Sequence, residues 1–178
     1  MRHELSAPRR QRAPEFVPQT GVKYTKKMLI EAVRSQAELL VREGRLSQTK
    51  QFIQHSDLSV YQHCCHVAYM SCLLSNKLRL AVNYRELIRG ALLHDYYLYD
   101  WHKRKKHPDF QHAFGHPSRA LRNALEDYDL TEREMQIIQR HMWPLTIIPP
   151  TCTEAWVIVL ADKICTVLEV FRKECVKL

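Results

Sequence analysis

Several histidine and aspartate residues of this 178-residue chain lie where helical periodicity predicts apolar side chains. His63 lies between Val60 and Val67 in one such stripe, and Asp162 interrupts a second one. His94, Asp95 and His141 occupy similar inward positions on other predicted helices. A buried carboxylate without a partner is costly, and even a neutral imidazole needs hydrogen-bond partners. For any single position a structural His–Asp pair is the commoner arrangement. The whole set together instead favours a divalent cation shared between helices.

The donor atoms of such a site are nitrogen and oxygen, without sulfur. This set suits a divalent transition metal, one or two ions of Mn, Fe, Ni, Co or Zn. Mg is possible but fits less well, because it prefers oxygen ligands to the nitrogen atoms of several imidazoles. The six cysteines include no Cys-x-x-Cys pair, so a thiolate zinc site is not expected and the thiols are predicted to be reduced. Four well-separated glycines exclude the Gly-rich loops of P-loop and dinucleotide-binding folds.

The elements that must position these residues are predicted to be helices throughout. We expect an all-α compact bundle in a single domain over residues 21–178, preceded by a flexible basic arm over residues 1–20. Residues 1–27 contain seven Lys or Arg and two Glu, which accounts for most of the formal charge of +8. The arm is either a solvated tail or a contact for RNA or an acidic partner. No apolar stretch is long enough for a membrane span or a secretory signal, so a cytoplasmic protein is predicted.

Capping residues give the predicted helix boundaries. Thr25 begins a helix that ends at Gly44, Ser47 begins a short one ending near His55, and Ser59 begins a long one ending near Arg79. Three pairs have the capping-box spacing: Asn83 with Glu86, Thr131 with Glu134, and Thr151 with Glu154. Pro117 is predicted in the first turn of a helix to Leu125, after a long loop from Tyr99 to Gly115.

The order of these residues resembles the H…HD…H…H…D pattern of the HD-domain superfamily of metal-dependent phosphohydrolases. The matching segments, within residues 55–172, are QHCCHVAYM, LLHDYYLYD, FGHPSRALRNAL, IIQRHMWPL and VLADKICTVLE. The resemblance implies an HD-type helical bundle in which His63, His94, Asp95 and Asp162 hold one metal. In the binuclear branch His116 and His141 would hold a second, with Asp95 bridging the two. Many relatives have a lysine three residues after the HD aspartate, where this chain has Leu98.

The resemblance implies hydrolysis of a phosphate mono- or diester, including a nucleotide, by a metal-activated water. We predict catalytic roles for Asp95 and Lys163, and substrate contacts near the end of the HD helix. The predicted substrate-binding residues are Lys103, Arg104, Lys105, Lys106 and His112, the last also being a reserve ligand. Two alternatives stay open: a di-iron oxygenase on the same ligand scaffold, and a non-catalytic metal or nucleotide sensor. The expected partner is a small phosphorylated substrate, with nucleic acid left open because of the basic arm.

Overall fold

Helices make up most of the structure, as the sequence predicts. The computed structural model describes residues 18, 19, 21–55, 57–100 and 108–171, without the side chains of residues 55 and 108–114. Residues 1–17 and 20 of the predicted arm lie outside this range. The described helices are α1 (Lys26–Glu43), the short 3₁₀ helix η1 (Leu46–Gln51), α2 (Val60–Leu78), α3 (Tyr84–Leu93), α4 (Pro108–Asp127), α5 (Glu132–Arg140) and α6 (Thr153–Val170). A two-stranded antiparallel sheet joins β1 (Ile53–His55) to β2 (Leu58–Ser59).

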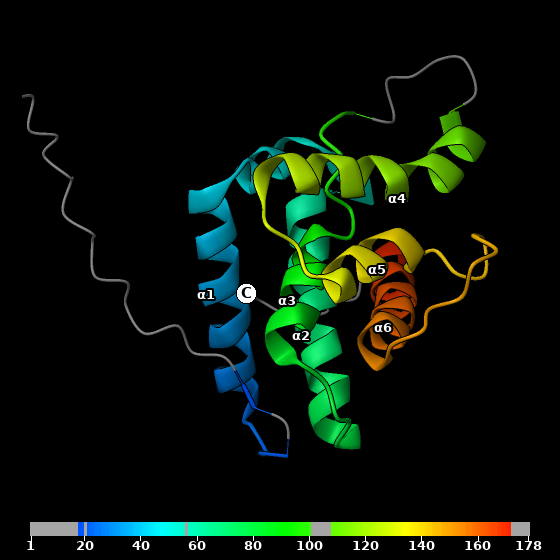
Figure 1. Ribbon diagram of the computed structural model, residues 1–178. Coiled ribbons are helices and arrows are strands. Elements are labelled where there is room, and N and C mark those ends of the chain that lie inside the picture. The colour runs from blue at the N-terminus through cyan, green and yellow to red at the C-terminus, as the bar shows by residue number, and fades with distance from the viewer. Residues whose placement is uncertain (1–17, 20, 56, 101–107, 172–178) are drawn as a thin grey trace, which may run out of the picture.

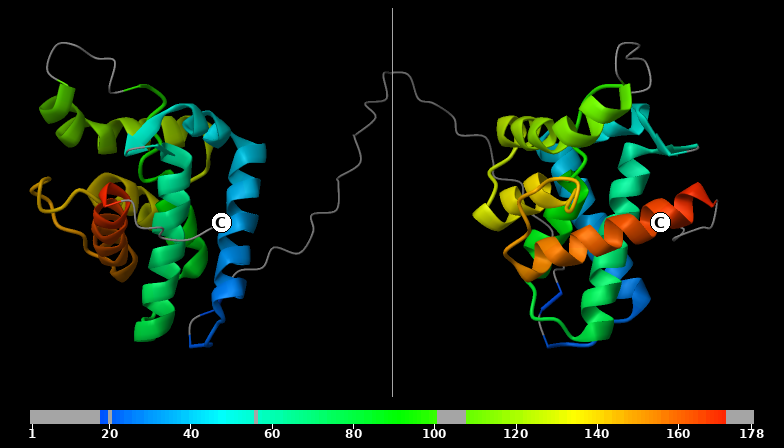
Figure 2. Two further views of the ribbon diagram at one scale, coloured as in Figure 1. Left: turned by 180° about the vertical axis from the view of Figure 1, so that it is seen from behind. Right: turned by 90° about the vertical axis from the view of Figure 1, so that its right-hand side faces the viewer.

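The central element is α2, which packs against α1, α3 and α6 (Figure 1). The side views show α6 crossing α2, while α4 lies across one end of the bundle (Figure 2). Apolar side chains from several helices fill the space between them and are fully buried, among them Leu29, Leu40, Leu87, Ile137 and Ile158. This main core holds together the helices and helix ends that carry the candidate ligands.

A glycine allows α3 and α5 to approach closely. A Cβ atom built on Gly90 would lie 2.6 Å from Cδ1 of Ile137, which is closer than real Cβ contacts. Because α3 ends just before His94 and α5 ends just before His141, this approach brings the two imidazoles together. Their ring centroids are 4.9 Å apart.

Most of the predicted caps are confirmed. The hydroxyl oxygens of Thr25 and Ser59 accept hydrogen bonds in the first turns of α1 and α2. Thr131 and Glu134 form the predicted capping box of α5. Asn83 caps α3 through its side chain, but its own backbone N–H donates to Glu154 rather than to Glu86.

The predicted box of Thr151 and Glu154 is wrong for the same reason. The carboxylate of Glu154 accepts from the backbone of Asn83 at 2.8 Å, and α6 begins after Cys152 without a side-chain cap. The backbone N–H of Thr151 instead donates to Gln136 at 2.6 Å. A partner distant in the sequence has replaced the local one.

Three other boundaries differ from the prediction. Pro117 lies inside α4, which begins at Pro108, so the predicted loop is shorter than Tyr99–Gly115. A proline inside a helix removes one backbone hydrogen bond and crowds the preceding turn, and a helix of 20 residues can continue past it because its other turns keep their hydrogen bonds. The short helix predicted from Ser47 to near His55 begins at Leu46 instead, so Ser47 lies inside it and is not its cap, and it ends at Gln51. The hairpin that follows is too short to produce an alternating pattern.

Membrane spans and disulfide bonds were not expected from the sequence, and the described residues bear on both. None of the described helices is long and apolar enough to cross a membrane. The five cysteines within the described part of the chain are free thiols, and four of them are buried.

Candidate metal centre

The HD pair lies in the turn that follows α3. The helix ends at Leu93, so His94 and Asp95 extend from its end and not from a continued helical stripe. The Nδ1–H of His94 donates to the carbonyl oxygen of Ala91 at 2.7 Å. This bond fixes the tautomer and leaves the lone pair of His94 on Nε2, in the buried interior.

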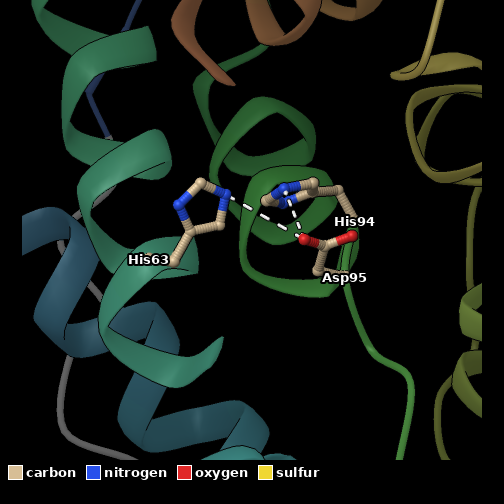
Figure 3. Close-up of side chains that lie close together, drawn as sticks. All are labelled: His63, His94 and Asp95. Atoms are coloured by element: carbon tan, nitrogen blue, oxygen red, sulfur yellow. Dashed lines mark ion pairs between the residues drawn. The ribbon is translucent and has the colours of Figure 1, made fainter. Parts of the chain in front are cut away.

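Two further predicted ligands approach the HD pair from α2 and α6. The Nε2 atom of His63 lies 3.1 Å from Oδ1 of Asp162 and 4.0 Å from Oδ2 of Asp95. The Nε2 atom of His94 lies 3.6 Å from Oδ2 of Asp95 and 3.9 Å from Oδ1 of Asp162. His63 and the HD pair point toward one another from neighbouring helices (Figure 3). These side chains form the first group of donor atoms.

A second group forms on the other side of Asp95. His116 lies on α4 and His141 directly after α5, and their Nε2 atoms are 2.9 Å apart. Oδ1 of Asp95 lies 3.2 Å from Nε2 of His116 and 3.5 Å from Nε2 of His141. The Nδ1–H of His141 donates to the carbonyl oxygen of Ile138 at 2.9 Å, which again leaves Nε2 facing the aspartate. All six predicted ligands therefore meet at one place.

Asp95 lies between the two groups and faces each with a different oxygen. Oδ2 faces His63 and His94, whereas Oδ1 faces His116 and His141. Gln54 on β1 donates to Oδ2 at 2.7 Å. Gln54 was not predicted from the sequence, because its strand is too short to be recognised by periodicity.

Glu169 is the other residue of the centre that sequence reasoning missed. Its two carboxylate oxygens accept from Nδ1 of His63 and Nδ1 of His66, both at 2.8 Å. The Glu169 side chain is 1% exposed, so both bonds are shielded from water. A signal was present, since Glu169 follows Asp162 by seven residues and so lies on the same face of α6.

Charge and burial determine how these groups hold protons. Burial alone would lower the pKa of His63, but hydrogen bonds to Asp162 and Glu169 outweigh it and raise that pKa to about 10. Burial and the neighbouring imidazoles lower the pKa of His141 to about 3. The pKa of Asp162 falls to about 2 although burial opposes this, because His63 and the other imidazoles favour its ionised form. The adjacent imidazoles likewise hold the pKa of Asp95 well below its usual range against the effect of burial.

The buried donor atoms fit a divalent cation. Nε2 of His94 and Oδ1 of Asp95 are buried and have no hydrogen-bond partner among the described residues. Metal–nitrogen bonds of about 2.1 Å place neighbouring donor atoms about 3.0–3.4 Å apart in octahedral or tetrahedral sites. The second group, at 2.9, 3.2 and 3.5 Å, matches this spacing, and the first group is slightly wider. The groups His63–His94–Asp95 and Asp95–His116–His141 could each hold a metal ion.

Of the remaining predicted residues, Lys163 is bonded to the backbone and the others lie outside the described residues or have side chains outside them. The ammonium group of Lys163 donates to the backbone carbonyl oxygen of Trp143 at 2.8 Å. Lys103, Arg104, Lys105 and Lys106 lie outside the described residues, and so does the side chain of His112. Their roles stay predictions.

The sequence matches no model of a known protein family, and no match was found among curated proteins or solved structures. The functional argument therefore depends on the geometry of the buried histidine and aspartate residues.

Proposed function

We propose that this protein is an HD-type metal-dependent phosphohydrolase that hydrolyses a phosphate mono- or diester, with nucleotides among its substrates. The observation that supports this most strongly is the position of Asp95, whose two oxygens face two separate groups of buried imidazoles. A carboxylate shared in this way is suited to bridging two cations. When bound, the cations supply Lewis acids and lower the pKa of a water molecule that serves as the nucleophile.

The protein's own residues hold and orient this centre. His63, His94, Asp95 and Asp162 would hold one ion, and His116 and His141 would hold the other together with Asp95. The backbone carbonyl groups behind His94 and His141 keep their Nε2 atoms unprotonated. Glu169 accepts from Nδ1 of His63, so that Nε2 of this ring faces Asp162 and Asp95, and a bound cation would displace the proton on Nε2.

Lys163 is the proposed cationic group for the phosphoryl oxygens, because it adjoins Asp162 on α6. To bind substrate, its ammonium group would give up its hydrogen bond to the carbonyl oxygen of Trp143 and donate to a phosphoryl oxygen instead. Lys103, Arg104, Lys105, Lys106 and His112 remain the proposed substrate contacts. Charge-assisted hydrogen bonds to phosphate are the interaction that these side chains offer.

An activity assay with two matched variants tests the proposal. Full-length protein supplied with Mn²⁺, Co²⁺ or Ni²⁺ should release phosphate from generic phosphate esters or nucleotides. Asp95→Asn, which keeps the side-chain shape, should abolish this release. Asp129→Asn makes the same change on the exposed turn before α5 and should leave the rate unchanged.

The alternatives give different results in the same experiment. Tightly bound iron with oxygen consumption and no phosphate release would replace the hydrolase with a di-iron oxygenase. Metal binding without turnover of any ester would instead support a sensor.

A further inference from the structure

A second candidate site lies at the opposite end of α2 from His63. A cavity of about 610 Å³ is formed there by the segment before α1, the start of α1 and the end of α2. Figure 1 and the left view of Figure 2 show these segments side by side at one end of the bundle. The volume is in the usual range for small-molecule sites, about 300–1,000 Å³.

The charges around this cavity all have one sign. Lys23, Lys26, Lys77 and Arg79 line it, and no carboxylate does within the described part of the chain. Among the described residues, none of these four side chains forms an ion pair with an acidic residue. All four residues are exposed, and cations grouped around a concave surface attract an anion more strongly than the same cations would if spread apart.

The start of α1 adds to this positive field. The N-terminus of a helix carries a partial positive charge and normally attracts acidic residues. The first turn of α1 contains no acidic residue, and Lys26 is its first residue. The helix N-terminus and Lys26 therefore both add positive potential at this end of the cavity.

The cavity is built on anchored residues. The backbone N–H and carbonyl oxygen of Tyr24 both bond to the side chain of Asn76, at 2.9 and 3.0 Å. The Tyr24 ring packs edge-on against Tyr84, with centroids 6.2 Å apart. These contacts tie the segment before α1 to α2 and α3.

A buried polar side chain of the lining also lacks a partner. Ser75 is fully buried, and its hydroxyl has no hydrogen bond within the described structure. Buried hydroxyl groups are nearly always bonded. Because this hydroxyl is closed off from solvent, it lies behind the cavity wall, and an occupant would contact the four cationic side chains instead.

We propose that this cavity binds a small organic phosphate. Its phosphate groups lie among the four cationic side chains, and its apolar part packs against the lining residues Leu73, Leu80 and Tyr84. Asn76 lies between three and four helical turns after His63 on α2, which places the two about 20 Å apart along the helix axis. The cavity is therefore distinct from the metal centre, and the proposal does not depend on the proposed hydrolase activity.

Titration calorimetry of the full-length protein in excess chelator tests this site with ATP as the probe and tripolyphosphate as the probe of charge alone. Without divalent cations the proposed metal centre does not turn over ATP, so the heat reports on the cavity. We expect ATP to bind more tightly than tripolyphosphate, and both affinities to fall as salt is added. The double variant Lys26→Ala, Lys77→Ala should weaken ATP binding by about tenfold or more, because charge-assisted bonds are lost. The control variant Lys27→Ala, Arg122→Ala removes the same charge from exposed positions that do not line the cavity, and should bind like the wild type.

A further variant separates this cavity from the metal centre. Asp95→Asn should leave ATP binding at the cavity unchanged, and circular dichroism checks that each variant is folded. Equal weakening in the cavity and control variants would overturn the proposal. So would the absence of ATP binding to wild-type protein at millimolar concentration, or loss of binding in folded Asp95→Asn alone.

Discussion

Replacing Glu169 with glutamine should weaken metal binding through His63 without touching a ligand. The carboxylate of Glu169 accepts one hydrogen bond from His63 and one from His66, both at 2.8 Å. The two imidazoles bond to different oxygens of Glu169, and an amide replaces one of these oxygens with an NH₂ donor, so the Glu169→Gln variant could not keep both bonds in place. With its raised pKa, His63 carries protons on both nitrogens in the metal-free protein, and metal binding must remove the proton on Nε2. If the amide NH₂ group faced His63, Nδ1 of that ring would have to lose its proton instead, and the proton left on Nε2 would block the ligand position.

Loss of such a supporting hydrogen bond typically lowers metal affinity about 10–100-fold, or about 1.4–2.7 kcal/mol. Titration calorimetry of Mn²⁺ or Zn²⁺ into metal-free protein measures this change. Glu126→Gln, an exposed partner of Arg45, is the matched control. His66→Ala should have little effect, because Glu169 would still accept from His63. Wild-type affinity in a folded Glu169→Gln variant would refute the reasoning about His63.

Two further predictions concern stability. Gly90→Ala should destabilise the protein by about 1–3 kcal/mol in urea unfolding, because the new methyl group overlaps Ile137 where α3 meets α5; unchanged stability would show that these helices can separate freely. The metal-free protein should lose stability on the order of 1–2 kcal/mol as the pH falls from 6.5 to 5. The pKa of His141 is about 3 in the folded protein and 6.5 ordinarily, so over this pH range the unfolded chain binds a proton at His141 and the folded protein does not. Urea midpoints that rise over this pH range would contradict the buried, neutral state of His141.

Local signals were sufficient for much of the fold. Thr25, Ser59 and Thr131 satisfy backbone N–H groups within their own first turns, so their roles can be predicted from neighbours in the sequence. The positions of His63 and Asp162 within apolar helical stripes could also be recognised from neighbouring residues alone, and the structure brings both side chains to the HD pair. Periodicity finds an inward-facing polar residue well because only its own helix is needed.

What sequence reasoning missed depends on contacts between distant segments. Glu154 has the spacing of a capping box but bonds to the backbone of Asn83, 71 residues away. Gln54 reaches Asp95 from a strand of three residues, too short to show a period. Glu169 could have been found from its spacing to Asp162, but its partners on α2 required the packing of α6 against α2.

The measurement that tests the central claim most directly is an element-resolved metal analysis of the purified full-length protein beside Asp95→Asn. The account predicts a stoichiometric divalent transition metal in the wild-type protein and a marked loss in the variant, because Asp95 faces both groups of imidazoles. A folded wild-type protein that neither carries nor takes up such a metal would contradict it. The buried histidines and aspartates would then be a hydrogen-bonded structural network.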